Sequence, residues 1–147
     1  MQSLKLEEFI PYRLNRIAAE VSRRTRKVYL KHYKLTIPEW RTLATLGQFG
    51  EMTATEIGRH SDMHKTKVSR ACKALEDRRW ITRVPSAVDR RQEVLNLTRT
   101  GLRAYDAIVP DIIGFERDFL RAIGQEDAAA LSTSLQALEK MLFKVRR

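Results

Sequence analysis

The sequence has little of what defines several special classes of protein. It holds one cysteine, six glycines and four prolines among 147 residues, which excludes a disulfide scaffold, a collagen-like chain and a low-complexity chain. No apolar run approaches the ~18 residues of a membrane span. Residues 1–8 carry acids and no continuous apolar stretch, so we expect no secretory signal. These absences predict a cytoplasmic protein whose lone Cys72 stays reduced.

Acidic residues are also scarce, and the excess of basic residues is local. The chain has 28 Lys and Arg against 18 Asp and Glu, a net charge of +10. Residues 13–34 hold eight basic groups against one acid, and residues 59–103 hold twelve against five, whereas residues 104–147 hold six against seven. Such a distribution favours a polyanionic partner, nucleic acid or less often a membrane surface, at the first two regions. The alternative is a generally solvated basic surface.

At 147 residues the chain fits one domain with its own core. The spacing of apolar residues predicts helices over about 4–33, 37–46, 54–60, 64–78, 99–123 and 126–145. Capping boxes Thr36–Glu39 and Thr53–Glu56 predict the starts of two of them, and Gly47 is expected to end the helix that Thr36 begins. Thr98 is the expected cap of the helix over 99–123, in which Pro110 should introduce a kink.

The basic middle of the chain has the pattern of a helix-turn-helix unit. A tight turn over 61–63 joins two predicted helices, and the second carries its apolar residues at helical spacing on one face. The opposite face is polar and mainly basic. Residues 81–84 and 93–97 then alternate as the strands of a hairpin do. In such units the second helix enters the major groove of DNA and a hairpin wing lies against the minor groove.

The candidate DNA contacts lie on that helix and at the hairpin tip. The residues expected to read base edges are Thr66, Ser69 and Arg70. The residues expected to bind phosphates are Lys65, Lys67 and Lys73. At the tip the candidates are Asp89, Arg90 and Arg91. We expect Arg90 to enter the minor groove, while Asp89, which cannot attract phosphate, holds a neighbouring arginine in a fixed pose.

Five segments together resemble the MarR (multiple antibiotic resistance regulator) family. They are residues 35–41 (LTIPEWR), 55–58 (TEIG), 65–70 (KTKVSR), 89–91 (DRR) and 97–101 (LTRTG). The resemblance spans nearly the whole chain. It implies a mostly helical, winged helix-turn-helix protein with a small β-wing, formed by one domain over 1–147.

The same resemblance implies how the domain is divided and what it does. Residues 36–98 would form the DNA-binding part, and residues 1–34 and 99–147 would supply the dimerisation helices. The function implied is that of a homodimeric transcription regulator, which we expect to repress from a pseudo-palindromic operator until a small ligand or an oxidant releases it. The alternative is an architectural or RNA-binding winged-helix protein without an effector.

Two residues depart from the family pattern near the ends of the second motif helix. His64 stands where an acidic cap is common, and histidine is a poor helix cap. Arg79 stands where glycine commonly ends the helix, so a left-handed turn there would cost on the order of 1 kcal/mol.

The first predicted helix has basic residues around two tyrosines, which suggests an anionic effector. Residues 11–14 (PYRL) and 38–41 (PEWR) resemble the family branch that controls aromatic-acid catabolism, including members that bind aromatic acyl-CoA thioesters. The candidate ligand-binding residues are Tyr12 and Trp40 as apolar walls, and Arg13, Arg16 or Arg41 for the carboxylate. The alternative is a solvated helix face, or one attracted to DNA phosphates without specificity.

Signals of an enzyme are poor. The three histidines have no metal-ligand spacing with Cys72 or with a pair of carboxylates. No nucleophile elbow, phosphate-binding loop or dinucleotide-binding fingerprint is present in the sequence. We therefore expect no enzymatic activity, no cofactor and no metal. Cys72 is interpreted as a small core residue, with a redox sensor as the alternative.

Overall fold

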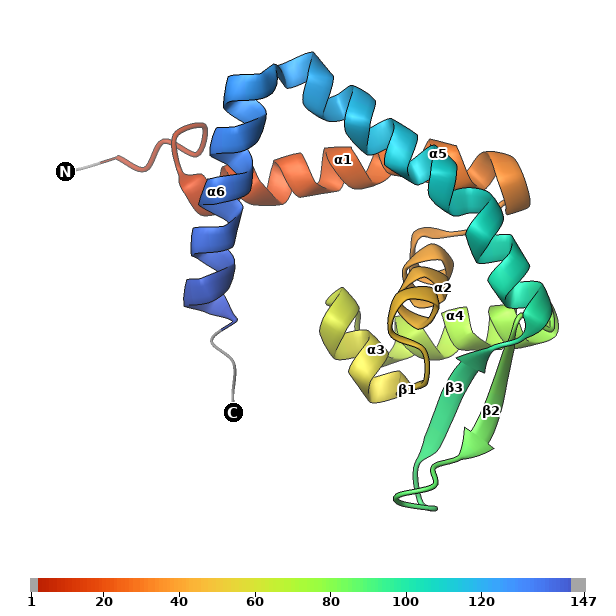
Figure 1. Cartoon of the computed structure of the whole chain (residues 1–147). Coiled ribbons are helices and arrows are strands. Elements are labelled where there is room, and N and C mark those ends of the chain that lie inside the picture. The colour runs from red at the N-terminus through yellow and green to blue at the C-terminus, as the bar shows by residue number, and fades with distance from the viewer. Residues whose placement is uncertain (1–2, 144–147) are drawn as a thin grey trace. The chain divides into compact units, whose positions relative to one another are not determined.

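The computed structural model describes residues 3–143, in which the elements are mainly helical (Figure 1). They are α1 (Ile10–Tyr33), α2 (Ile37–Phe49), β1 (Met52–Thr53), α3 (Ala54–Ser61), α4 (Lys65–Asp77), β2 (Ile81–Pro85), β3 (Glu93–Leu97), α5 (Arg99–Ile123) and α6 (Gln125–Leu142). The chain divides into two compact units after Asp111, and α5 belongs to both of them. The predicted mostly helical fold with a small β-wing is confirmed.

Helices α2 and α3 both begin with the predicted capping boxes. The hydroxyl of Thr36 accepts the backbone N–H of Glu39 at 3.3 Å, and the Glu39 carboxylate accepts the backbone N–H of Thr36 at 3.1 Å. Thr53 and Glu56 repeat this exchange at 3.2 and 2.7 Å. The hydrogen bonds from Thr53 lower the pKa of Glu56. Each box satisfies backbone donors that have no partner in the first helical turn.

Two predicted helix ends were wrong. The first helix starts at Ile10 rather than near residue 4, and Pro11 lies in its first turn, where the missing N–H of proline costs least. Gly47 does not end α2, which continues to Phe49 and ends at Gly50 with φ 77°. A Cβ at Gly47 would lie 2.7 Å from the ring of Tyr105, so this glycine permits close packing of α5 on α2.

The wing belongs to a three-stranded antiparallel sheet in the order β1-β3-β2. The sequence predicted β2 and β3 but not β1, which pairs Met52 with Leu95 and Thr53 with Val94. Two residues are too short to show a period, and Thr53 already serves as the cap of α3. The predicted hairpin is confirmed, with Ile81 opposite Leu97 at its base and Pro85 opposite Glu93 near its tip.

The apolar face of α4 forms the centre of the helix-turn-helix core. The buried residues of α4 are Val68, Ala71, Cys72 and Leu75, the set expected from helical spacing. Both α2 and α3 pack against α4, with Leu43 of α2 and Ile57 of α3 completely buried. Because this face is held on two sides, the opposite face of α4 has a fixed direction.

The end of α4 meets three other elements at Trp80. The edge of its ring meets the ring of Tyr33 at a centroid distance of 4.9 Å, and the Arg78 guanidinium lies 5.1 Å from its centroid. Its carbonyl accepts the N–H of Thr98 at 2.8 Å. Thr98 caps α5 as predicted, since its hydroxyl accepts the N–H of Gly101 at 3.0 Å.

In the second unit, residues 112–143, Gly124 separates α5 from α6 as predicted, with φ 90°. Within this part, α6 buries none of its residues. Leu131 and Leu135 of the predicted seam are about 40% exposed, at 39% and 42%. The helix was predicted to reach residue 145, and residues 144–147 lie outside the described residues. The kink at Pro110 stays a prediction.

We predict that Gly101→Ala destabilises the protein, whereas Gly114→Ala on the same helix does not. A Cβ at residue 101 would lie 2.0 Å from the backbone oxygen of Trp80, while the nearest atom to one at residue 114 is 3.8 Å away. Such overpacking costs about 3 kcal/mol, whereas alanine in an open helix position gains about 1 kcal/mol over glycine. Urea unfolding measures both, and equal stability of the two variants would contradict the packing argument.

Candidate nucleic-acid interface

The second motif helix, α4, is positioned by the tight turn before it. Asp62 adopts a left-handed conformation with φ 50°, and the N–H of Met63 donates to the carbonyl of Gly58 at 2.9 Å. His64 then caps α4, because its Nδ1 accepts the N–H of Thr66 at 3.3 Å. Histidine is a poor cap by residue type, yet His64 occupies the N-cap position of α4, where its imidazole accepts this one hydrogen bond in place of a carboxylate.

The C-terminus of α4 has the left-handed residue that the sequence suggested. Arg79 has φ 59°, and the N–H of Trp80 donates to the carbonyl of Leu75 at 2.9 Å. The N–H of Arg79 donates to Glu76 at 2.8 Å, which completes a Schellman motif. Arg79 thus adopts the left-handed backbone conformation that is strained for residues other than glycine.

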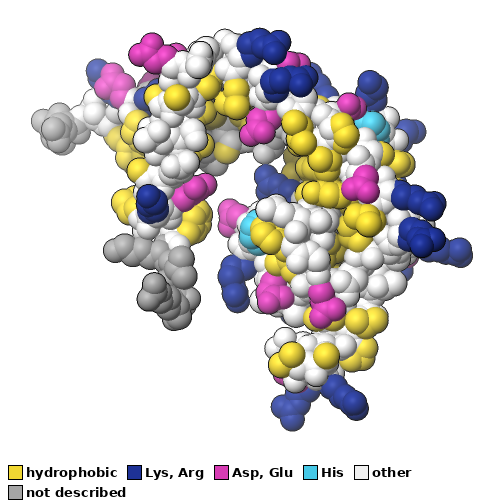
Figure 2. All heavy atoms as spheres, viewed as in Figure 1, with side chains coloured by type: hydrophobic (Ala, Val, Ile, Leu, Met, Phe, Trp, Pro, Cys, Tyr) yellow, Lys and Arg dark blue, Asp and Glu magenta, His cyan; other side chains and the backbone are white. Residues whose placement is uncertain are grey.

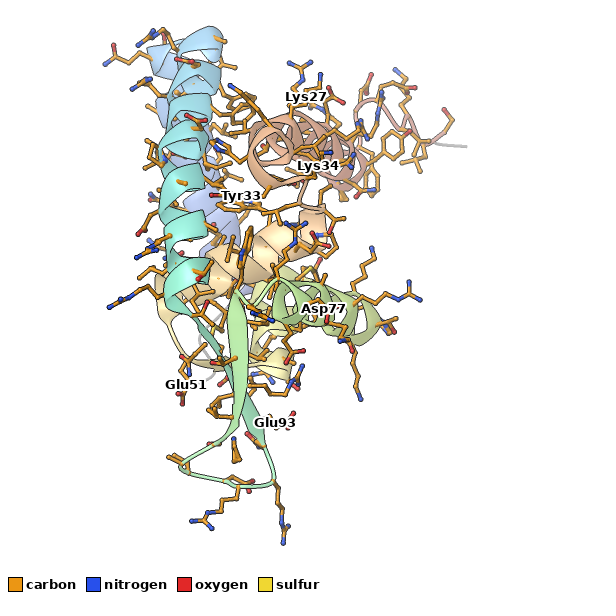
Figure 3. The ribbon with its side chains drawn as sticks, turned by 90° about the vertical axis from the view of Figure 1, so that its right-hand side faces the viewer. Lys27, Tyr33, Lys34, Glu51, Asp77 and Glu93 are labelled. Atoms are coloured by element: carbon orange, nitrogen blue, oxygen red, sulfur yellow. The ribbon has the colours of Figure 1, made fainter. Side chains whose placement is uncertain are left out.

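The polar face of α4 is open to solvent. All six candidate contacts on the helix are exposed: Lys65, Thr66, Lys67, Ser69, Arg70 and Lys73. Lys73 donates to Asp77 at 2.6 Å, which raises the pKa of the lysine. Figure 3 shows Asp77 near the end of α4. A phosphate contact at Lys73 would therefore have to replace a protein carboxylate, whereas Lys67 makes no ion pair within residues 3–143.

The wing tip is ordered by short side chains. The hydroxyl of Ser86 accepts the N–H of Val88 at 3.2 Å, and the Asp89 carboxylate accepts the backbone N–H of Arg91 at 3.0 Å. The restraint by Asp89 thus acts on the main chain of the tip and not on an arginine side chain. The tip presents Arg90 and Arg91 to solvent, and Figure 2 shows basic side chains at the far end of the wing.

Arg83 ties the wing to α4, and the sequence analysis missed it. From β2 its guanidinium donates to Glu76 of α4 at 3.0 Å and to Glu93 of β3 at 3.1 Å. The bond to Glu76 is the main cause that raises the pKa of Arg83. The Arg83 side chain is about one-third exposed, at 33%, and that of Glu76 is 28% exposed. This partly buried pair fixes the helix relative to the wing strands.

The candidate ligand-binding residues have different surroundings in the structure. Trp40 stacks on the buried ring of Tyr29 at 5.4 Å and lies 6.4 Å from Tyr105, and burial raises the pKa of Tyr29 to about 12. On α1, Tyr12 and Arg13 are exposed, and the Arg16 guanidinium lies 5.8 Å from the Tyr12 ring.

A cavity of about 590 Å³ does lie where the first helix meets the helix-turn-helix unit. Of the candidate residues, it includes Arg41. Arg41 donates to the Ser61 carbonyl at 3.5 Å and to the Ser22 hydroxyl at 3.4 Å, both long contacts that leave most of its donors available. The other lining residues are Asn15, Ala18, Ala19, Ser22, Arg23, Ile37, Pro38, Asp62, Met63, His64 and Lys67.

Some of the positive charge on α1 is neutralised by an acid on the same helix, Glu20. Glu20 accepts hydrogen bonds from Arg23 at 2.7 Å and from Arg24 at 2.8 Å. These hydrogen bonds lower the pKa of Glu20, and the one from Arg24 has the larger effect. The arginines of the middle of α1 therefore carry less free positive charge than the sequence count implies.

Cys72 is completely buried on the core face of α4, and burial raises its pKa to about 11. A thiol with so little thiolate is a poor nucleophile, which supports the interpretation as a core residue. Within residues 3–143, no three His, Cys, Asp or Glu side chains gather in a group that would hold a metal. No helix in that part is long and apolar enough to cross a membrane.

The fold and this interface define a winged helix-turn-helix DNA-binding protein. A model described as the MarR family matches residues 33–92. The uncharacterized HTH-type transcriptional regulator YwoH of Bacillus subtilis is 26% identical over 121 residues, which are 82% of this chain and 87% of the relative.

Solved structures with the same fold include complexes. The S. aureus MepR–DNA complex is 21% identical, with a TM-score of 0.75 over 91% of this chain and 98% of the other. NadR in complex with 4-hydroxyphenylacetate is 19% identical, with a TM-score of 0.77 over 95% and 99%. Residues 33–92 therefore match the MarR family, whose members are DNA-binding transcription regulators and not enzymes.

We predict that Glu76→Gln weakens DNA binding although it removes an acid. Simple electrostatics predicts tighter binding, but the loss of the Arg83 contact frees the wing from α4 and should cost about 1 kcal/mol, or about fivefold in Kd. Asp77→Asn is the matched control, since it removes a neighbouring acid, frees Lys73 and should tighten binding to any duplex. Fluorescence anisotropy measures both. Tighter binding by both variants would show that Arg83 has no positioning role.

Proposed function

We propose that the protein is a homodimeric repressor that reads a pseudo-palindromic operator with α4 and the wing. The observation that carries this proposal is the union of an exposed, basic face of α4 with a wing that Arg83 holds to the same helix. A rigid pair of elements can meet a major groove and the adjacent minor groove at once. The MepR–DNA complex, which has the same fold, supports this assignment.

Unpartnered apolar residues support the dimer. At the start of α1, the preceding residue Phe9 is 44% exposed, and Ile10 and Ile17 of the helix are 54% and 55% exposed. On α6, which buries no residue within the described part, Met141 and Leu142 are 59% and 64% exposed. Exposed apolar stripes on two helices of one chain are typical of an interface between protomers. Two copies of α4 about one DNA turn apart, ~34 Å, would then contact two half-sites.

The test of base reading compares Arg70→Ala with Lys67→Ala. An operator is first selected from a pool of random duplexes. Loss of a base contact at Arg70 should cost about 1–3 kcal/mol on the operator and little on a random duplex, whereas loss of a phosphate contact at Lys67 should weaken both and flatten the dependence on salt.

Two outcomes of this experiment count against the proposal. An equal loss on both duplexes for Arg70→Ala would remove its base-reading role. A wild-type protein that binds operator and random duplex alike would favour the alternative of an architectural or RNA-binding winged-helix protein without an effector.

We also propose that a small aromatic carboxylate, or its CoA thioester, binds in the cavity between α1 and the helix-turn-helix unit. Binding there would release the DNA from the protein. Arg41 provides free guanidinium donors there, and Lys67 adds a second cation. NadR, which shares the fold, is described with 4-hydroxyphenylacetate. Trp40 is the neighbour of Arg41 in sequence, but its ring stacks on Tyr29 in the aromatic cluster. We propose Tyr12, Arg13 and Arg16 only as ligand contacts at the outer edge of the site.

The effector is tested by calorimetry with benzoates, hydroxycinnamates and their CoA thioesters. A ligand that weakens operator binding 100-fold must bind the DNA-free protein 100-fold better, a coupling of about 2.7 kcal/mol. Arg41→Gln should lose this binding, and Lys27→Gln is the control, since Lys27 is an exposed cation of α1 that does not line the cavity. If no compound binds below about 1 mM, or binding leaves operator affinity unchanged, the effector proposal fails while DNA binding stands.

A further inference from the structure

His64 both caps α4 and lines the cavity next to α1. It is the N-cap of α4, where its Nδ1 accepts the N–H of Thr66 at 3.3 Å, and it forms part of the wall of the cavity between α1 and α2. Thr66 is the first candidate base-reading residue of α4. The cap therefore joins the cavity to the turn of the helix that enters the major groove.

The capping contact restricts the protonation state of the ring. An imidazole nitrogen accepts a hydrogen bond only when it carries no proton, so the cap requires neutral His64 with its proton on Nε2. Protonation places hydrogen on Nδ1 as well. The Thr66 N–H then loses its acceptor, and the imidazolium lies at the positive end of the helix dipole.

Charged residues line the same cavity as His64 from each neighbouring element. They are Arg23 of α1, Arg41 of α2, Asp62 of the turn and Lys67 of α4, and Lys65 follows His64 directly in sequence. The three cations that line the cavity make it attractive to an anion, and the negative charge of a bound anion would favour proton uptake by a ring beside it.

We propose that His64 is a positioning residue for DNA reading, whose protonation releases the first turn of α4 and lowers the preference for the operator. The proton can be supplied by acid, or its uptake can be favoured by a small organic anion in the cavity. This inference rests on the proposed base-reading role of α4. It couples the occupancy of the cavity to DNA reading through the single side chain of His64.

The test is the ratio of operator to random-duplex affinity as a function of pH at constant ionic strength. A new positive charge attracts both duplexes equally, so the ratio reports the position of α4 and not its charge. From about pH 8 to about pH 5.5, the range in which imidazoles titrate, the wild-type ratio should fall about fivefold, the usual worth of a cap.

His64→Asn and His60→Asn are the decisive variants. Asparagine caps a helix but does not titrate, so His64→Asn should keep the wild-type ratio at high pH and hold it to acid pH. His60, which meets the Phe49 ring edge-to-face at the surface of α3, is the control, and His60→Asn should retain the wild-type fall. If His64→Asn falls as the wild type does, the inference is overturned. A wild type with no operator preference at any pH would instead overturn the proposed function.

Benzoate, used as the probe, tests the anion route. Calorimetry in two buffers of different ionisation enthalpy counts the protons taken up on binding. The wild type should take up a fraction of a proton, and His64→Asn none. Benzoate binding without proton uptake by the wild type would overturn the anion route, and absence of binding would overturn it together with the effector proposal, while the pH experiment decides the role of His64.

Discussion

The close approach of Trp80 and Gly101 is the constraint on which the unit over residues 3–111 depends. The Trp80 carbonyl accepts the Thr98 N–H, and its oxygen leaves no room for a Cβ at Gly101. On the other side, Arg78 lies over the ring and donates to the Tyr33 carbonyl at 3.0 Å. The end of α1, the end of α4, the start of β2 and the start of α5 therefore meet at one residue. This junction therefore helps to fix the direction of α4.

Three acids of the basic regions hold arginines in place. Glu20 binds two arginines of α1, while Glu76 and Glu93 bind Arg83. The net charge of +10 consequently overstates the charge that is free to meet phosphate. It is the placement of the unpaired cations on α4 and at the wing tip that favours DNA over other polyanions.

Local signals in the sequence predicted what depends on local chemistry. Both capping boxes and the buried face of α4 follow from residues within one or two turns of each other. Gly47 was misread because a glycine in a helix has two meanings, an end or a close approach. Only the position of Tyr105, far along the chain, decides between them. The Arg83 contacts were missed for the same reason, since their partners lie seven and ten residues away on different elements.

In the proposed effector mechanism, the position of Arg41 decides how a ligand in the cavity would act on DNA binding. Its guanidinium joins α2 to the Ser22 hydroxyl of α1 and to the carbonyl of Ser61 at the end of α3. Both contacts are long, so a carboxylate that pairs with Arg41 gains more than these bonds cost. The carboxylate would thereby loosen the tie between α1 and the turn that begins α4. A ligand changes an equilibrium only through contacts that differ between its two states. In this cavity Arg41 contacts the helix-turn-helix unit through the Ser61 carbonyl, and the His64 ring contacts it through the Thr66 N–H.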